Sequence, residues 1–69
     1  MSVSIGRVTT LSSRSDTSFE DAINQGVARA AATLRNVTGA WVKEQKVEVS
    51  GDQVAAYHVV LEVTFILED

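Results

Sequence analysis

The chain has 69 residues, enough for one small domain spanning residues 1–69, and it contains neither cysteine nor proline. Hydrophobic residues make up 45% of it and charged residues 22%, with a formal net charge of -3, which is typical of a folded chain and not of a disordered one. Without cysteine, disulfides and thiolate metal sites are excluded. A domain of this size is only marginally stable alone, so association with further copies is the remaining source of stability.

The charge and hydropathy pattern also limits the classes of partner. The six Lys and Arg residues are spread singly along the chain, so binding to nucleic acid is not expected. No apolar stretch approaches the roughly 20 residues that cross a bilayer, and the first four residues have neither a basic nor an apolar targeting region. These features predict a soluble, cytoplasmic protein that does not bind membranes.

The first half of the chain predicts one strand and one helix. Residues 3–11 are expected to form a short first strand, and residues 12–16 a polar loop that leads into the helix. The helix is predicted over residues 18–36, where apolar residues recur with the spacing of one helical face. They are Phe19, Ala22, Ile23, Val27, Ala30, Leu34 and Val37.

Local signals mark both ends of this predicted helix. Thr17 and Ser18, followed by Glu20 and Asp21, predict a capping box at its start. Asn36 to Gly39 supplies residues that can leave the helix in a left-handed conformation. A glycine inside a helix costs about 1 kcal/mol relative to alanine, so Gly26 predicts a closely packed neighbouring backbone.

The second half predicts an antiparallel hairpin. Residues 41–49 form the second predicted strand, residues 50–53 the connecting loop with Gly51 at a positive φ, and residues 55–67 a long third strand. The third strand alternates strictly, and its apolar face is predicted to pack against the helix. That face carries Tyr57, Val59, Leu61, Val63, Phe65 and Leu67.

The predicted fold class is therefore α+β, a β-α-β-β chain whose three-stranded antiparallel sheet is covered on one face by a single amphipathic helix. The other face of the sheet would remain uncovered. With strict alternation, and with Val42 facing the helix, it would carry apolar residues that usually mark an interface or a ligand site. The residues of this face would be, from the second strand, Trp41, Lys43, Gln45, Val47 and Val49, and from the third His58, Val60, Glu62, Thr64 and Ile66. This arrangement predicts a multimer packed through that face.

An ordered set of short matches along the chain resembles the dodecin family. The matches are Ser18-Phe19-Glu20-Asp21-Ala22-Ile23, Ala28-Arg29-Ala30, Thr33-Leu34-Arg35, Val42-Lys43-Glu44, Tyr57, Val59, Leu61-Glu62-Val63, Phe65 and Leu67-Glu68. The resemblance implies a flavin-binding homo-oligomer, a hollow dodecamer built from trimers, that stores or sequesters riboflavin or FMN between symmetry-related subunits. The alternative is a flavin-free shell with a structural role or another ligand, such as an ion or a nucleotide-containing cofactor.

The residues implied for the flavin site are Trp41, His58 and Gln45. The family's ring-stacking tryptophan falls at Gly39 here, but Trp41 stands two residues later and should share its strand face. His58 occupies the position of the family's ring-pairing glutamine, and Ile66 that of an arginine found in some members. Trp41 therefore either stacks on a flat heteroaromatic ligand or fills a subunit interface.

Catalytic and metal-binding constellations are not evident in the sequence. The serines lie without nucleophile-elbow glycines, and His58 is the only histidine, so an enzyme is not expected. The acidic residues of the second half do not follow calcium-loop spacing, so no metal site within one chain is predicted. A site shared between subunits stays open, as does a simple hydrogen-bonding role for His58.

Overall fold

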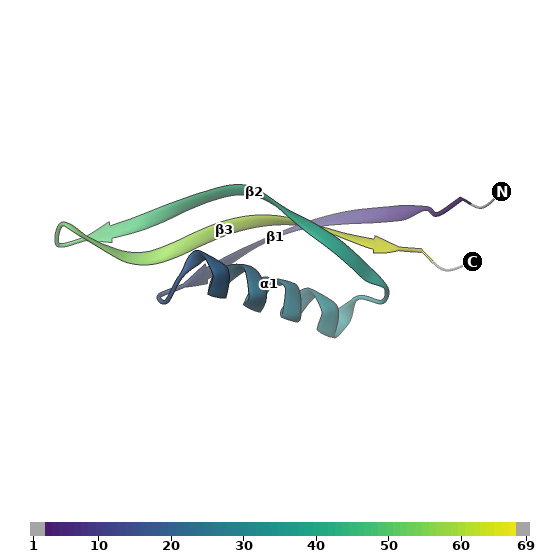
Figure 1. Ribbon diagram of the computed structural model, residues 1–69, viewed down its shortest axis with the longest axis horizontal. Coiled ribbons are helices and arrows are strands. Elements are labelled where there is room, and N and C mark those ends of the chain that lie inside the picture. Colours follow the sequence, from purple (N-terminus) through teal and green to yellow (C-terminus); the bar gives the residue numbers. More distant parts are fainter. Residues whose placement is uncertain (1–2, 68–69) are drawn as a thin grey trace.

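A computed structural model describes residues 3–67, arranged as one helix against a three-stranded sheet (Figure 1). Met1, Ser2 and Glu68, which the sequence analysis used for the targeting region and for the family pattern, lie outside the described residues. The elements follow in the order β1 (Gly6–Ser15), α1 (Phe19–Thr33), β2 (Val37–Ser50) and β3 (Gln53–Ile66). The predicted β-α-β-β architecture is confirmed. Among the described residues, no helix is long and apolar enough to cross a membrane.

The sheet has the strand order β1-β3-β2, and both strand pairs are antiparallel. The third strand is therefore central, which explains why its alternating apolar row is the most deeply buried part of the chain. The predicted hairpin between the second and third strands is confirmed. Its turn consists of Gly51 and Asp52, both at positive φ (58° and 62°), which is the two-residue turn whose twist matches paired strands.

The first strand is placed differently from the prediction. It begins at Gly6 instead of residue 3 and continues through Ser15, so the predicted polar loop over residues 12–16 is wrong except at its end. Ser12 to Ser15 pair with Val60 to Tyr57 of β3. Serines and an arginine read as a loop in the sequence, but pairing with the central strand supplies the backbone hydrogen bonds that hold them extended.

The helix begins at Phe19 with Ser18 as its N-cap, as the capping signal predicted, and ends at Thr33, three residues before the predicted end. The Ser18 hydroxyl accepts a hydrogen bond from the backbone N–H of Asp21 at 2.9 Å. The Asp21 carboxylate does not complete the predicted capping box. It instead accepts from the buried hydroxyl of Ser15 at 2.6 Å, and the Ser15 oxygen accepts from the N–H groups of Thr17 and Ser18.

The chain leaves the helix through Asn36, whose φ of 61° confirms the predicted left-handed exit. The backbone of Asn36 then accepts a hydrogen bond from Ile66 at 3.0 Å, which fixes the beginning of β2 beside the end of β3. The second and third strands extend beyond the predicted ranges, β2 at both ends and β3 at its start. At the hairpin Ser50 pairs with Gln53, and at the other end Val37, Gly39 and Ala40 pair with Phe65, Thr64 and Val63 of β3.

The core lies between α1 and β3. Its buried members are Ala22, Ala30, Val59, Leu61 and Val63, bordered by half-buried Leu11, Phe19, Ile23, Val27, Leu34 and Val37. Gly26 faces this core, but its close neighbours are side chains, so the predicted backbone contact is wrong. A Cβ at Gly26 would lie 2.7 Å from Leu61 Cδ1 and 3.2 Å from Ser13 Cβ. Glycine is required there because the helix lies directly on the side chains of β1 and β3.

Candidate functional site

The face of the sheet opposite α1, here named the open face, is defined by three rows of cross-strand neighbours. Each row takes one residue from β1, one from β3 and one from β2. The rows are Thr10-Glu62-Trp41, Ser12-Val60-Glu44 and Arg14-His58-Lys46. Residues directly opposite each other in antiparallel strands share a face, and the intervening β3 residues Leu61 and Val59 are fully buried under the helix.

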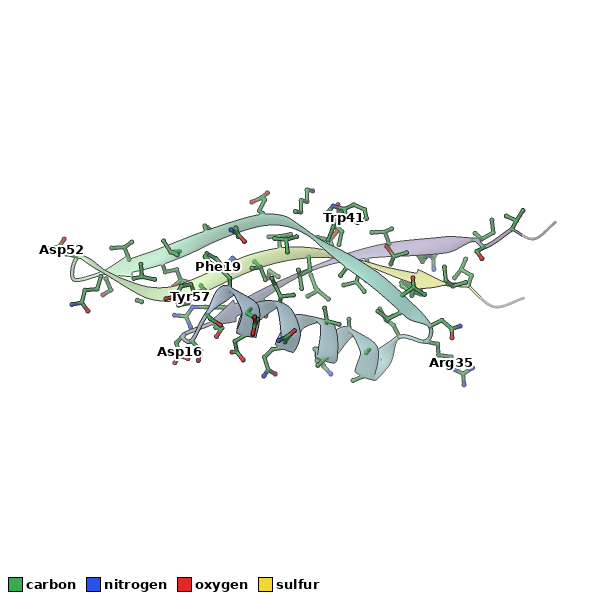
Figure 2. The ribbon with its side chains drawn as sticks, viewed as in Figure 1. Asp16, Phe19, Arg35, Trp41, Asp52 and Tyr57 are labelled. Atoms are coloured by element: carbon green, nitrogen blue, oxygen red, sulfur yellow. The ribbon has the colours of Figure 1, made fainter. Side chains whose placement is uncertain are left out.

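Trp41 lies on this open face near the middle of the long sheet (Figure 2). Its side chain is 52% exposed, a large value for a tryptophan in a strand. Glu62 stands directly opposite it on β3, and Thr10 Oγ1 donates a long hydrogen bond of 3.5 Å to Glu62 Oε2 from the other side. The row thus presents a flat indole beside a carboxylate, and both can be reached from solvent.

His58 lies on the same face, but two rows away from Trp41. On β3 it is four residues from Glu62, the cross-strand partner of Trp41, which corresponds to about 13 Å along an extended strand. One chain therefore does not bring Trp41 and His58 to opposite sides of a single ring.

The row around His58 is strongly charged. Arg14 on β1 and Lys46 on β2 flank His58 on either side. Arg14 Nε donates a hydrogen bond of 2.8 Å to Glu48 Oε2, so this ion pair joins the two edge strands across β3. The hydrogen bond from Arg14 lowers the pKa of the Glu48 carboxyl, and the same bond raises the pKa of Arg14. Both groups remain in solvent, so the pair orients the side chains more than it stabilises the fold.

Gln45 is not on the open face, so the predicted placement of Gln45 on the same sheet face as Trp41 is wrong. The register shifts between Val42 and Glu44, where Lys43 is an extra residue opposite β3. After this bulge Gln45 pairs with Val59 and Val47 with Tyr57, so both belong to the helix side of the sheet. A bulge inserts one residue and reverses the alternation that follows it, which strict alternation could not predict.

Arg14, Lys46 and Glu48 are site residues that the sequence analysis missed. Arg14 was assigned to a loop, and Lys46 and Glu48 were assigned to the wrong face because the bulge was not recognised. The missed part of the first strand, Ser12 to Ser15, has none of the β-branched or aromatic residues that favour strands, so its sequence contains no signal for the extension.

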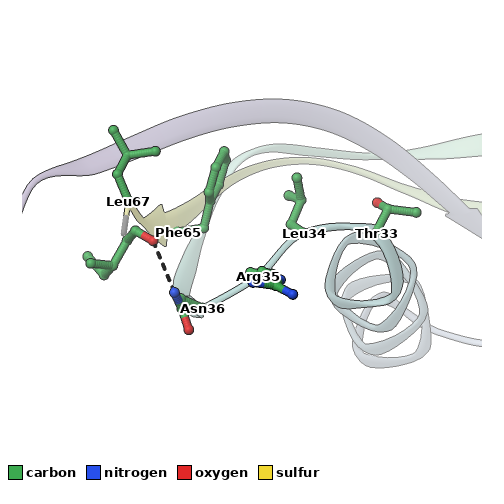
Figure 3. A pocket seen from close by; sticks show the side chains of 7 residues that line it. Thr33, Leu34, Arg35, Asn36, Phe65 and Leu67 are labelled. Carbon is green, nitrogen blue, oxygen red and sulfur yellow. Dashed lines mark hydrogen bonds between the residues drawn. The ribbon is translucent and has the colours of Figure 1, made fainter. Parts of the chain in front are cut away.

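A shallow pocket of about 300 Å³ lies at the other end of the molecule, where α1 leads into β2 beside the end of β3 (Figure 3). Its lining residues are Thr33, Leu34, Arg35, Asn36, Phe65, Ile66 and Leu67. At the edge of this pocket, Asn36 Nδ2 donates a hydrogen bond of 3.3 Å to the backbone carbonyl of Ile66. Trp41, His58 and Gln45 do not line it, so the predicted flavin residues and this pocket are separate.

Within residues 3–67, no group of three or more His, Cys, Asp or Glu side chains is placed to hold a metal ion within one chain. The described chain also holds no cluster of perturbed acids and bases in a cleft. The chemistry that its open face offers is stacking on the exposed indole, together with hydrogen bonding and charge from the three rows.

Comparison with known proteins identifies the family. The family model described as Dodecin matches residues 5–68. The dodecin from Streptomyces coelicolor is 32% identical and superposes with a TM-score of 0.90, over 100% of this chain and 99% of that one. A variant of the T. thermophilus dodecin is 36% identical with a TM-score of 0.90, over 97% and 100% of the two chains.

A third structure is the calcium dodecin of Mycobacterium tuberculosis, a calcium-chelating antigen. It is 30% identical with a TM-score of 0.80, and the match covers 93% of this chain and 91% of that one. A comparison with curated proteins returns no significant match. The match of the family model over nearly the whole described chain and the agreement of the folds lead to one conclusion: the chain belongs to the dodecin family.

Proposed function

We propose that the chain is the subunit of a homo-oligomeric binding protein, a dodecamer built from trimers, that holds riboflavin or FMN between symmetry-related copies of Trp41. The observation that carries the proposal is the 52% exposure of Trp41 on a sheet face that no element of its own chain covers. An exposed indole on a rigid strand is a ready stacking surface for a flat heteroaromatic ring. Membership of the dodecin family supports flavin as that ring.

The need for further copies follows from the small core. The buried hydrophobic residues of the described chain are Ala22, Ala30, Ala56, Val59, Leu61 and Val63, of which three are alanines. Large apolar side chains remain exposed on several strands, among them Val8, Trp41, Val42, Val47, Val49 and Val54. Burying these side chains between subunits would supply the hydrophobic stabilisation that a chain of this size lacks.

The ring would be held mainly by Trp41, and a partner subunit would present its own His58 to the ring edge. A neutral imidazole offers one donor and one acceptor, which suits the alternating donors and acceptors on the pyrimidine edge of a flavin. Gln45 is left out of this proposal because it pairs with Val59 on the helix side. A store of this kind needs no catalytic residues, since binding alone lowers the free concentration of the ligand.

A fluorescence titration tests the proposal. Trp41 is the only tryptophan, so all tryptophan emission reports on this one site. Adding riboflavin or FMN should quench the tryptophan and the flavin emission together, because stacking of the indole on the flavin ring quenches the emission of both. Light scattering in the same buffer should give a mass many times that of one chain. Assembly without any quenching would favour the flavin-free shell instead.

A further inference from the structure

The pairing of Trp41 with Glu62 suggests how the site would choose its ligand. The two residues are direct cross-strand partners, so their Cβ atoms lie about 5 Å apart. A ring stacked on the indole would therefore have one edge beside the carboxylate. This inference rests on the proposed stacking role of Trp41.

The surroundings of Glu62 leave its negative charge dominant over this part of the open face. The neighbouring row on one side consists of Val8, Thr64 and Gly39, and the row on the other side of Ser12, Val60 and Glu44. Neither row contains a cation, and Glu44 adds a second carboxylate. The basic residue nearest to Trp41 along the chain is Lys43, which lies in the bulge and has no cross-strand partner of its own. The basic residues Arg14 and Lys46, which flank His58, lie two rows away from Trp41.

The hydroxyl of Thr10 contributes to the orientation of this charge. It donates to Glu62 Oε2, so that oxygen is already engaged from the β1 side. The other oxygen remains available to accept from a ligand. Indole faces attract cations, and carboxylates accept from N–H groups, so the two side chains favour the same kind of ring.

We infer that Glu62 is the specificity-determining residue of the Trp41 site, selecting flat heteroaromatics whose ring is cationic or carries an N–H donor on its edge, and excluding rings with anionic edges. Oxidised flavin satisfies the rule because its ring is uncharged and has an imide N–H. Trp41 would supply the surface on which the ring stacks. Glu62 would decide which ring charge is accepted, neutral or positive but not negative.

Two probe rings of similar size and opposite charge test the inference. Proflavine is a flat cation with amino donors, and anthraquinone-2-sulfonate is a flat anion. Titration of tryptophan emission in the wild-type protein should give tighter binding for proflavine than for riboflavin, and the weakest binding for the sulfonate. In Glu62→Gln the ratio of proflavine to sulfonate affinity should fall at least about tenfold, because a unit charge at about 5 Å acts with opposite sign on the two probes.

Matched variants separate charge from structure. Glu20→Gln removes a carboxylate of the same kind from the first turn of α1, outside the open face, so it should preserve the affinity ratio. Lys43→Gln removes the nearest cation in the chain and should leave the ratio unchanged or increase it. Light scattering and circular dichroism should match the wild type for each variant. If Glu62→Gln does not assemble, the wild-type order of the three ligands and the Lys43→Gln ratio still test the inference.

The outcomes separate this inference from the proposed function. Riboflavin quenching with an affinity ratio that Glu62→Gln leaves unchanged would overturn the role of Glu62 and leave the flavin proposal intact. Proflavine quenching that depends on Glu62, without riboflavin binding, would support the role of Glu62 and overturn the flavin proposal. A sulfonate that binds as tightly as proflavine to the wild type, or no quenching by any ring, would overturn the inference directly.

Discussion

Gly26 of α1 and Leu61 of β3 lie so close that a Cβ on the glycine would stand 2.7 Å from Leu61 Cδ1. This single contact sets how near the helix approaches the central strand. Leu61 is fully buried, and Ser13 Cβ, which is attached directly to the backbone of β1, would stand 3.2 Å from the same added Cβ. The position of the helix on the sheet therefore depends on a residue with no side chain.

Gly26→Ala should destabilise the protein even though alanine is the better helix former. The helix gain is about 1 kcal/mol, whereas overpacking a tight core costs about 1–3 kcal/mol. We expect a net loss of about 1 kcal/mol in the free energy of unfolding, measured by urea denaturation. Asn24→Ala, at an exposed position of the same helix, is the control and should be neutral or slightly stabilising. A Gly26→Ala protein more stable than the wild type would contradict the close packing.

Ser15→Ala should weaken the junction between β1 and α1. The buried Ser15 hydroxyl accepts a hydrogen bond from the N–H of Thr17 and donates one to Asp21 Oδ2. Alanine at this position removes both hydrogen bonds. Loss of a buried hydrogen-bonding group costs about 1–3 kcal/mol. Thermal unfolding should show a clear fall in Tm for this variant and almost none for Ser12→Ala, whose side chain is exposed on the same strand. Equal effects of the two substitutions would show that the junction hydroxyl has no special role.

The ion pair between Arg14 and Glu48 should give a small stability contribution that depends on pH. Because the pKa of Glu48 is lowered in the folded state, the contribution is present above the carboxyl pKa of the unfolded chain and is lost as the pH falls through the folded value. Arg14→Met should therefore lower the Tm slightly at neutral pH and not at all in strong acid. High salt should also remove the difference, since both groups are exposed. A difference that persists in acid would have to come from packing of the arginine stem.

Assembly should depend on the open face. Val60 lies at its centre, between Ser12 and Glu44, and Val60→Asp would bury an unpaired charge at a subunit contact at a cost of several kcal/mol. Light scattering should show loss of the oligomer for this variant and its retention for Val60→Ala. Normal assembly of Val60→Asp would show that subunits meet through another surface.

Periodicity predicted the elements that bury a continuous apolar row. The helix carrying Ala22 and Ala30 and the strand carrying Val59 and Leu61 were both identified in this way, because burial imposes the spacing. The same method missed residues 12–15 of β1, where Ser13 lies beneath the helix at Gly26 and Ser12 and Arg14 lie on the open face. Packing against the helix and pairing with β3 place these residues in the strand. Their polar side chains form no periodic apolar row that a sequence could show.

The candidate site was predicted less well than the fold. Trp41 and His58 lie on the expected face, but the bulge at Lys43 moves Gln45 to the opposite one. A bulge depends on the pairing of two strands, so the sequence of β2 alone does not reveal it. Glu62 and Arg14 acquire their places beside Trp41 and His58 only through the register of β3 with its two neighbours.

The affinity for riboflavin of the wild type and of Trp41→Ala, followed by flavin emission, tests the central proposal most directly. The proposal predicts saturable quenching in the wild-type oligomer and binding at least about fivefold weaker in Trp41→Ala, corresponding to about 1 kcal/mol of lost stacking. Trp41→Phe should fall between the two, and all three proteins should have the same mass by light scattering. Equal riboflavin affinity in the wild type and in Trp41→Ala would contradict the claim that Trp41 holds the flavin.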